Sequence, residues 1–222
     1  MAVQLDYDDK IAIVRLGGDE NRFSPAFLDD IDDALDQAVS DGAQGLVTTA
    51  GEKFYSNGLD LDWLSAHTDR AQWYIGRVHQ LLARMLTLSI PTAAAVVGHA
   101  FGAGAMLAVA HDFRVMRADR GYFCFPEVDI RIPFNPGMAA LIQSKLTPRA
   151  AVASMTTGRR FGGPDAEQFG IVDVACPADA VTDTAVAELR PLQGKDPGTL
   201  GAIKTTMFGH VVRALTDDDE SL

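Results

Sequence analysis

A glycine-rich stretch, Gly98–Gly104, is the first part of this chain whose residue types could do chemistry. It follows a run of small and β-branched residues, 92–97, that predicts a buried strand, and it precedes a helical run, 105–110. A strand that ends in glycines before a helix exposes backbone N–H groups where the helix dipole also favours negative charge. Such a loop can bind a phosphate or stabilise an oxyanion.

Taken alone, this stretch has two other interpretations, a dinucleotide-binding loop and a simple packing contact. Gly102-Ala103-Gly104 is followed by Ala105-Met106-Leu107, so the third glycine of a dinucleotide-binding fingerprint is absent. The small residues could also serve only to let the helix pack closely on the strand. The stretch by itself favours this packing role.

Two further segments add polar groups. Residues 53–61 read Lys-Phe-Tyr-Ser-Asn-Gly-Leu-Asp-Leu and follow a predicted strand, Gly45–Thr49. Residues 125–130 read Phe-Pro-Glu-Val-Asp-Ile. Glu127 alone would be a surface glutamate at the end of a strand. Its apolar neighbours, with Ile132 and Pro133 behind it, favour a partly desolvated carboxylate, whose raised pKa would suit a general base.

In this order and spacing, the three segments resemble the crotonase (enoyl-CoA hydratase/isomerase) superfamily. The resemblance extends to Asn21–Pro25 and to Gly170-Ile171-Val172, and it spans roughly residues 3–174. It implies an α/β fold of the ClpP/crotonase type, a spiral of β-β-α units with C-terminal helices. We therefore expect one crotonase-like domain over 1–222, with a spiral core at 1–174 and a C-terminal helical region at 175–222.

The resemblance also implies site residues. The backbone N–H groups of Leu59 and Ala103 would form an oxyanion hole for a thioester, and Glu127 would be the catalytic acid–base. Hydratases of this family carry a second glutamate in the helix after the glycines, where this chain has Met106, and no Asp or Glu occurs from Gly98 to Ala110. Because moving a double bond needs only one proton shuttle, the chain looks most like a Δ3,Δ2-enoyl-CoA isomerase, which converts 3-enoyl-CoA to 2-enoyl-CoA in fatty-acid or related acyl-CoA metabolism.

Binding residues follow from the same resemblance. Lys53 and Arg22 are candidates to bind coenzyme A, although either could be a solvent-facing charge. The candidates for an acyl pocket, which could equally be core residues, are Tyr55, Phe101, Met106, Phe125, Ile132 and Phe134. No metal site and no cofactor other than the coenzyme A of the substrate is expected, and Asp60 is expected to cap a helix.

Other activities fit the same residues. A hydratase, a thioester hydrolase or a decarboxylase could use the same oxyanion hole. A non-catalytic acyl-CoA-binding relative is a hypothesis of a different class, motivated by Met106 and opposed by the retention of Glu127.

The composition limits the partners. The 222 residues carry a formal net charge of −11 and a pI of about 4.7, without any Lys/Arg-rich block, which argues against nucleic acid and polybasic membrane binding. Two cysteines form no disulfide framework. With no targeting pattern at the start of the sequence, we expect a cytoplasmic protein. The resemblance implies a homotrimer or a hexamer, and the acidic tail 217–220 is expected to be solvated.

The elements that must position these residues can be read from periodicity. We predict a β-hairpin at 3–7 and 11–16, a helix at 27–39 that begins at Ser24-Pro25, and one long helix at 63–88. Strands are predicted at 112–116 and 122–125. The remainder is expected to be helical, at 137–145, 148–157, 164–169, 178–189 and 197–215.

Overall fold

The computed structural model describes residues 3–51 and 53–217, and its strands form two sheets. The larger sheet has the order β1-β2-β3-β5-β7-β9, in which β1 and β2 pair antiparallel and the other described pairs are parallel. Its strands are β1 (Gln4–Asp8), β2 (Ile11–Arg15), β3 (Gly45–Thr49), β5 (Thr92–Val96), β7 (Phe113–Arg117) and β9 (Val174–Cys176). The smaller sheet is parallel and consists of β4 (Phe54–Ser56), β6 (His99–Phe101) and β8 (Phe123–Cys124).

Successive strands alternate between the two sheets. β3, β5 and β7 lie in the larger sheet, and β4, β6 and β8, which follow them along the chain, lie in the smaller one. After each such pair the chain enters a helix, so the central part of the chain is three β-β-α units wound in series. The ends of β4, β6 and β8 therefore meet at one place, where the segments singled out in the sequence come together.

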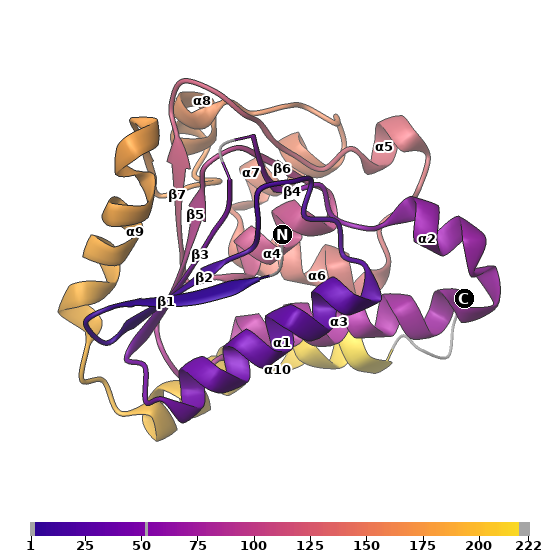
Figure 1. Ribbon diagram of the computed structural model, residues 1–222. Coiled ribbons are helices and arrows are strands. Elements are labelled where there is room, and N and C mark those ends of the chain that lie inside the picture. The colour runs from indigo at the N-terminus through magenta and orange to yellow at the C-terminus, as the bar shows by residue number, and fades with distance from the viewer. Residues whose placement is uncertain (1–2, 52, 218–222) are drawn as a thin grey trace.

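Helices cover both faces of the larger sheet (Figure 1). α9 packs on β3, β5 and β7 from one side, and α10 lies along α3 and α6 on the other. The helices are α1 (Pro25–Ser40), α2 (Leu61–Ala66), α3 (Ala71–Thr87), α4 (Ala103–Ala110), α5 (Glu127–Ile130), α6 (Pro136–Lys145), α7 (Pro148–Met155), α8 (Gly163–Gln168), α9 (Val181–Leu189) and α10 (Pro197–Thr216), with 3₁₀ turns at Thr68–Arg70, Ala178–Ala180 and Arg190–Leu192.

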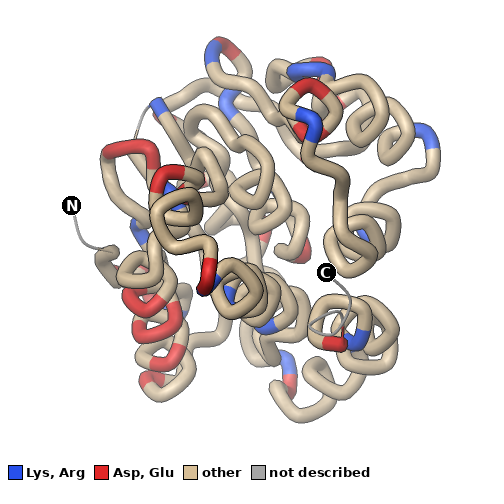
Figure 2. Tube along the Cα trace, turned by 90° about the vertical axis from the view of Figure 1, so that its right-hand side faces the viewer, with Lys and Arg blue, Asp and Glu red and all other residues tan. Residues whose placement is uncertain are grey.

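α1 shows how the acidic composition is arranged. Ser24 caps the helix by accepting a hydrogen bond from the Phe27 N–H, and Pro25 stands in its first turn. Its apolar residues face the core, while aspartates cover the other face, and Figure 2 shows acidic residues gathered along a helix at the flank of the molecule. Arg77 and Arg84 of α3 form ion pairs with these aspartates.

Small residues bring α4 close to the strands. All eight of its residues are buried. A Cβ on Gly104 would lie 2.4 Å from the backbone oxygen of Ser56, so only glycine allows α4 to approach β4 this closely. Gly102, just before α4, has a φ of +51°, a conformation that favours glycine. These two positions place the start of α4 beside the loop after β4.

Several predicted elements are confirmed and others are wrong. The hairpin, α1, β3 and β5 lie within two residues of their predicted bounds. The long helix predicted over 63–88 is instead broken into α2, a 3₁₀ turn and α3, because the backbone leaves the helical conformation at His67 (φ −134°, ψ 51°), whose ring stacks on Trp63. The sequence analysis did not predict β4, β6, β9 or the short helix α5.

β9 also bears on the expected division of the domain. The predicted boundary between core and helical region, at 174/175, falls inside this strand, which pairs with β7 in the larger sheet. The start of the region expected to be helical therefore belongs to the sheet. The predicted acidic tail lies, from residue 218 onward, outside the described residues.

Candidate active site

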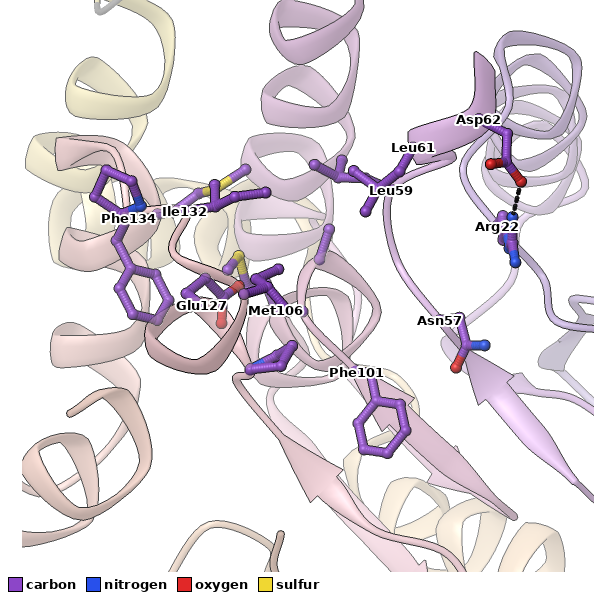
Figure 3. Close-up of a pocket in the computed structure, with 16 residues that line it drawn as sticks. Arg22, Asn57, Leu59, Leu61, Asp62, Phe101, Met106, Glu127, Ile132 and Phe134 are labelled. Carbon is purple, nitrogen blue, oxygen red and sulfur yellow. Dashed lines mark hydrogen bonds and ion pairs between the residues drawn. The ribbon is translucent and has the colours of Figure 1, made fainter. Parts of the chain in front are cut away.

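A cavity of about 400 Å³ lies where the loop after β4, the start of α4 and the segment around α5 converge (Figure 3). Glu127, Ile132 and Phe134 stand on one side of it, and Leu59 and Leu61 on the other. Its walls are mainly apolar, as expected of a small-molecule site. The lining residues are Arg22, Asn57, Leu59, Leu61, Asp62, Phe101, Gly102, Ala103, Met106, Pro126, Glu127, Ile130, Ile132, Pro133, Phe134 and Met138.

Glu127 is a buried acid in this cavity. It is the first residue of α5, and it is only 9% exposed. Its Oε2 is buried and has no hydrogen-bond partner among the described residues. Burial raises the pKa of Glu127 to about 7, against a smaller opposite effect from a backbone hydrogen bond. A carboxyl group with this pKa can both take up and release a proton near neutral pH.

Two backbone N–H groups at the cavity wall, those of Leu59 and Ala103, make no hydrogen bond within the described part of the chain. The N–H of Ala103 is free because this residue begins α4. The N–H of Leu59 has a defined direction. The Gly58 carbonyl of the same peptide group accepts a hydrogen bond from the Phe23 N–H at 2.8 Å, and in a trans peptide the N–H points the opposite way.

The two free N–H groups belong to segments in direct contact. A Cβ on Gly58 would lie 2.7 Å from the Ala103 nitrogen, and Gly58 has a φ of +75°. The loop after β4 therefore rests directly on the start of α4. Asp60 caps α2, as predicted, by accepting a hydrogen bond from the Trp63 N–H at 3.1 Å.

The second carboxylate of the wall has different surroundings. Asp62 is 88% exposed and forms an ion pair of 2.6 Å with Arg22 at the edge of the cavity (Figure 3). Met106 is buried where a second catalytic glutamate would stand in a hydratase. Among the described lining residues, Glu127 is thus the only buried carboxyl group.

The expected acyl-pocket residues divide into two groups. Phe101, Met106, Ile132 and Phe134 line the cavity. Tyr55 and Phe125 do not, and the structure places both in the core. The Tyr55 hydroxyl lies 2.7 Å from Thr48 Oγ1 of β3. The Phe125 ring packs edge-on against Phe123 and, from behind the wall, against Phe134.

The two candidate cations for coenzyme A also differ. Arg22 lines the cavity, and its ion pairs with Asp62 and Glu20 raise the pKa of its guanidinium. Lys53 is exposed and outside the cavity wall, with its Nζ 4.9 Å from the centre of the Phe54 ring. Only Arg22 is thus in position to contact a ligand inside the cavity.

Several wall residues were not predicted from the sequence. Leu61 and Met138 each stand shortly after a helix cap, Asp60 and Asn135, and those caps were the available signal. Within residues 3–51 and 53–217, no group of three or more His, Cys, Asp or Glu side chains could hold a metal ion. No helix in the same ranges is long and apolar enough to cross a bilayer.

The sequence matches the family model described as enoyl-CoA hydratase/isomerase over residues 8–219. The chain belongs to the enoyl-CoA hydratase/isomerase family. This confirms the resemblance to the crotonases, and the chain is an enzyme of this family. It is 34% identical over 216 residues to the peroxisomal enoyl-CoA delta isomerase 1 of Arabidopsis thaliana, covering 94% of this chain and 90% of the relative.

Further similarity supports the same family. The chain is 36% identical over 191 residues to the enoyl-CoA delta isomerase 3 of Arabidopsis thaliana, with 81% of this chain and 79% of the relative covered. The crystal structure of human mitochondrial delta3-delta2-enoyl-CoA isomerase superposes with a TM-score of 0.90 at 21% identity, covering 98% of this chain and 87% of that one. The predicted crotonase-type fold is therefore confirmed.

Proposed function

We propose that this member of the enoyl-CoA hydratase/isomerase family converts 3-enoyl-CoA to 2-enoyl-CoA, with Glu127 as its single proton shuttle. The observation that carries the proposal is the burial of this one carboxyl group, whose pKa is raised to about 7, in a cavity whose lining includes Leu59 and Ala103, two residues with backbone N–H groups that make no hydrogen bond among the described residues. The names of the Arabidopsis relatives, enoyl-CoA delta isomerases, support it.

In the proposed reaction, Glu127 removes a proton from C2 of the bound thioester. The negative charge moves to the thioester oxygen, where the N–H groups of Leu59 and Ala103 stabilise it as an oxyanion hole. The protonated Glu127 then returns the proton to C4, and the electrons of the enolate form the C2–C3 double bond. The product has the same atoms as the substrate, and the carboxylate is regenerated.

Hydration would need more than this cavity offers. A water molecule must be activated and a proton delivered, work that two carboxyl groups share in the hydratases of the family. Met106 cannot do either, and Asp62 is engaged with Arg22 at the edge of the cavity. The isomerase reaction is therefore the better match to the residues present.

The remaining assignments are proposals on the same basis. The acyl chain would lie against Phe101, Met106, Ile132 and Phe134, and Arg22, with Lys53 farther out, would bind the coenzyme A part. The substrate's coenzyme A would be the only coenzyme involved. A homotrimer or hexamer and a cytoplasmic location also stay proposals. Of the two plant isomerases compared above, one is named peroxisomal.

The test is an assay of 3-hexenoyl-CoA conversion to 2-hexenoyl-CoA with the wild type, Glu127→Gln and Asp62→Asn. Loss of general acid–base catalysis should lower kcat by about 10²–10⁴-fold in Glu127→Gln. Asp62→Asn is the matched control because it neutralises the other carboxylate of the wall. It should retain kcat, since an exposed ion pair contributes little.

Other outcomes would identify other reactions. Hydration of crotonyl-CoA at an enzymatic rate would contradict the isomerase assignment. Release of free coenzyme A would indicate a hydrolase, and release of carbon dioxide a decarboxylase. Tight binding of acyl-CoA without turnover would indicate a non-catalytic relative, and unchanged activity of Glu127→Gln would remove this residue from the mechanism.

A further inference from the structure

The backbone N–H groups on either side of Leu59 are both bonded to side-chain hydroxyls. The Gly58 N–H donates to Ser56 Oγ at 3.0 Å, and the Asp60 N–H donates to Tyr74 Oη at 2.8 Å. Between them, the Leu59 N–H makes no hydrogen bond within the described residues. Three consecutive amides thus alternate between bonded, free and bonded.

We propose that Tyr74, assisted by Ser56, is a positioning residue that aims the Leu59 N–H at the thioester oxygen of the substrate. This inference rests on the proposed function, in which that N–H is one of the two oxyanion donors. Tyr74 does not line the cavity, so it would act only through the peptide groups next to Leu59.

The surroundings of Tyr74 suit this role. It is a fully buried residue of α3, and its ring packs against Trp63 of α2 at a centroid distance of 5.0 Å. Burial raises the pKa of Tyr74 to about 12, so the hydroxyl stays neutral at any working pH. The Tyr74 hydroxyl can therefore accept the hydrogen bond from the Asp60 N–H over this whole pH range. It belongs to the long helix α3 and not to the loop that it holds.

Ser56 fixes the other side of the loop. Its hydroxyl donates to the Asn21 backbone oxygen at 2.7 Å, so a lone pair is left to accept the hydrogen bond from Gly58. Three hydrogen bonds therefore hold the loop: those of the Gly58 N–H and the Asp60 N–H to the two hydroxyls, and that of the Phe23 N–H to the Gly58 oxygen. A donor held in this way needs no reorganisation when charge develops on the substrate, which is the requirement for an effective oxyanion hole.

A purely structural role for the Tyr74 hydroxyl is the competing explanation, because a buried N–H needs an acceptor in any case. The chain offers a matched control. Tyr55 is also fully buried, and its hydroxyl is also hydrogen-bonded, in this case to Thr48, but within the described residues neither hydroxyl is hydrogen-bonded to Gly58 or Asp60. Tyr74→Phe and Tyr55→Phe remove the same atom from comparable surroundings.

The experiment compares the wild type, Tyr74→Phe, Tyr55→Phe and Ser56→Ala. Kinetics are measured with 3-hexenoyl-CoA. The infrared carbonyl band of bound trans-2-hexenoyl-CoA, labelled with ¹³C at the thioester carbon, reports how strongly the oxyanion donors polarise the carbonyl. In the wild type we expect this band below its frequency in water.

Tyr74→Phe should lower kcat by about 10–100-fold with little change in KM, because a misdirected donor acts mainly on the transition state. Its carbonyl band should shift back toward the frequency in water. Tyr55→Phe should match the wild type in both measurements. Ser56→Ala should resemble Tyr74→Phe, and it decides the question if Tyr74→Phe does not fold.

Two results would overturn the proposal in distinguishable ways. If Tyr74→Phe and Ser56→Ala match Tyr55→Phe in kcat and in the carbonyl band while the wild type is active, the positioning role is wrong and the proposed function stands. If the wild type neither isomerises 3-hexenoyl-CoA nor lowers the carbonyl band, the proposed function fails, and the positioning role fails with it.

Discussion

The carboxylate of Glu127 lies against Gly102, with Oε1 3.6 Å from the point where a Cβ on residue 102 would stand. Gly102 directly precedes Ala103, whose free N–H begins α4. The buried acid and a free backbone donor are therefore neighbours, although 24 positions separate Glu127 from Ala103 in the sequence. The arrangement puts the proposed base and one of the two proposed oxyanion donors on the same small part of the cavity.

The activity should depend on pH through Glu127. As the proposed base it would work only when it is deprotonated, and its pKa is raised to about 7 by burial. We expect kcat/KM for 3-hexenoyl-CoA to rise with pH up to about 7 and then to level off. Asp62→Asn should keep this profile, whereas a profile that levels off near pH 4–5 in the wild type would contradict a desolvated base.

The stability of Glu127→Gln relative to the wild type should also depend on pH. The folded-state pKa lies above the ordinary value of 4.5 for a free glutamate, so the stability that the neutral acid contributes is complete below about 4.5 and is lost as pH rises through about 7. Glutamine carries no charge at any pH. Relative to the wild type, the free energy of unfolding of Glu127→Gln should increase by about 1–3 kcal/mol when the pH is raised from 5 to 8. Urea denaturation at both pH values measures this difference, and a constant difference would contradict the raised pKa.

Gly58→Ala should disrupt the contact between the two segments that carry the free N–H groups. The new Cβ would lie 2.7 Å from the Ala103 nitrogen, at a φ of +75°. Gly170→Ala is the control, because Gly170 has a φ of +69° and nothing within 4 Å of the added atom. Gly170→Ala should cost about 1 kcal/mol of stability and leave kcat unchanged. Gly58→Ala should cost about 1–3 kcal/mol more and lower kcat at least tenfold. Equal effects of the two substitutions on kcat would contradict the prediction.

Met106→Glu should change the titration of Glu127. Both side chains line the same cavity, and a second carboxylate there would raise the pKa of the first by like-charge repulsion. We expect the rise of kcat/KM to move to higher pH. Met106→Gln introduces a similar shape without the charge and should leave the pH profile in place. An identical pH profile in both variants would show that a charge at position 106 does not change the pKa of Glu127.

The ion pair between Lys204 and Asp112 should matter for stability and not for catalysis. Lys204 of α10 is buried, and its Nζ donates to Asp112 Oδ2 at 2.6 Å and to the Ile90 carbonyl at 2.9 Å. Lys204→Met removes the cation that is hydrogen-bonded to Asp112, which keeps its hydrogen bonds from Thr92, and should cost about 1–3 kcal/mol in urea denaturation. Because Lys204 is not part of the cavity wall, kcat should be unchanged at a temperature where the variant is folded.

The sequence by itself determined the family and much of the fold. Local signals located α1 from its cap at Ser24 and the strands β3 and β5 from their apolar runs. The order of three motifs indicated the family and singled out Glu127, because residue types and spacing along the chain are enough for that inference. Met106 could be identified from the sequence for the same reason, because it occupies the position in the motif where an acid is missing.

Only the tertiary structure decided which side chains reach the cavity. Tyr55 and Lys53 belong to the same motif as Leu59, yet Tyr55, inside β4, is in the core, and Lys53, just before β4, is in solvent. The cavity that buries Glu127 is lined both by its neighbours in sequence and by distant residues such as Gly102 and Met106. The hydrogen bond of Tyr74 to the loop at Leu59 also joins residues of two different elements, and no local pattern could encode it.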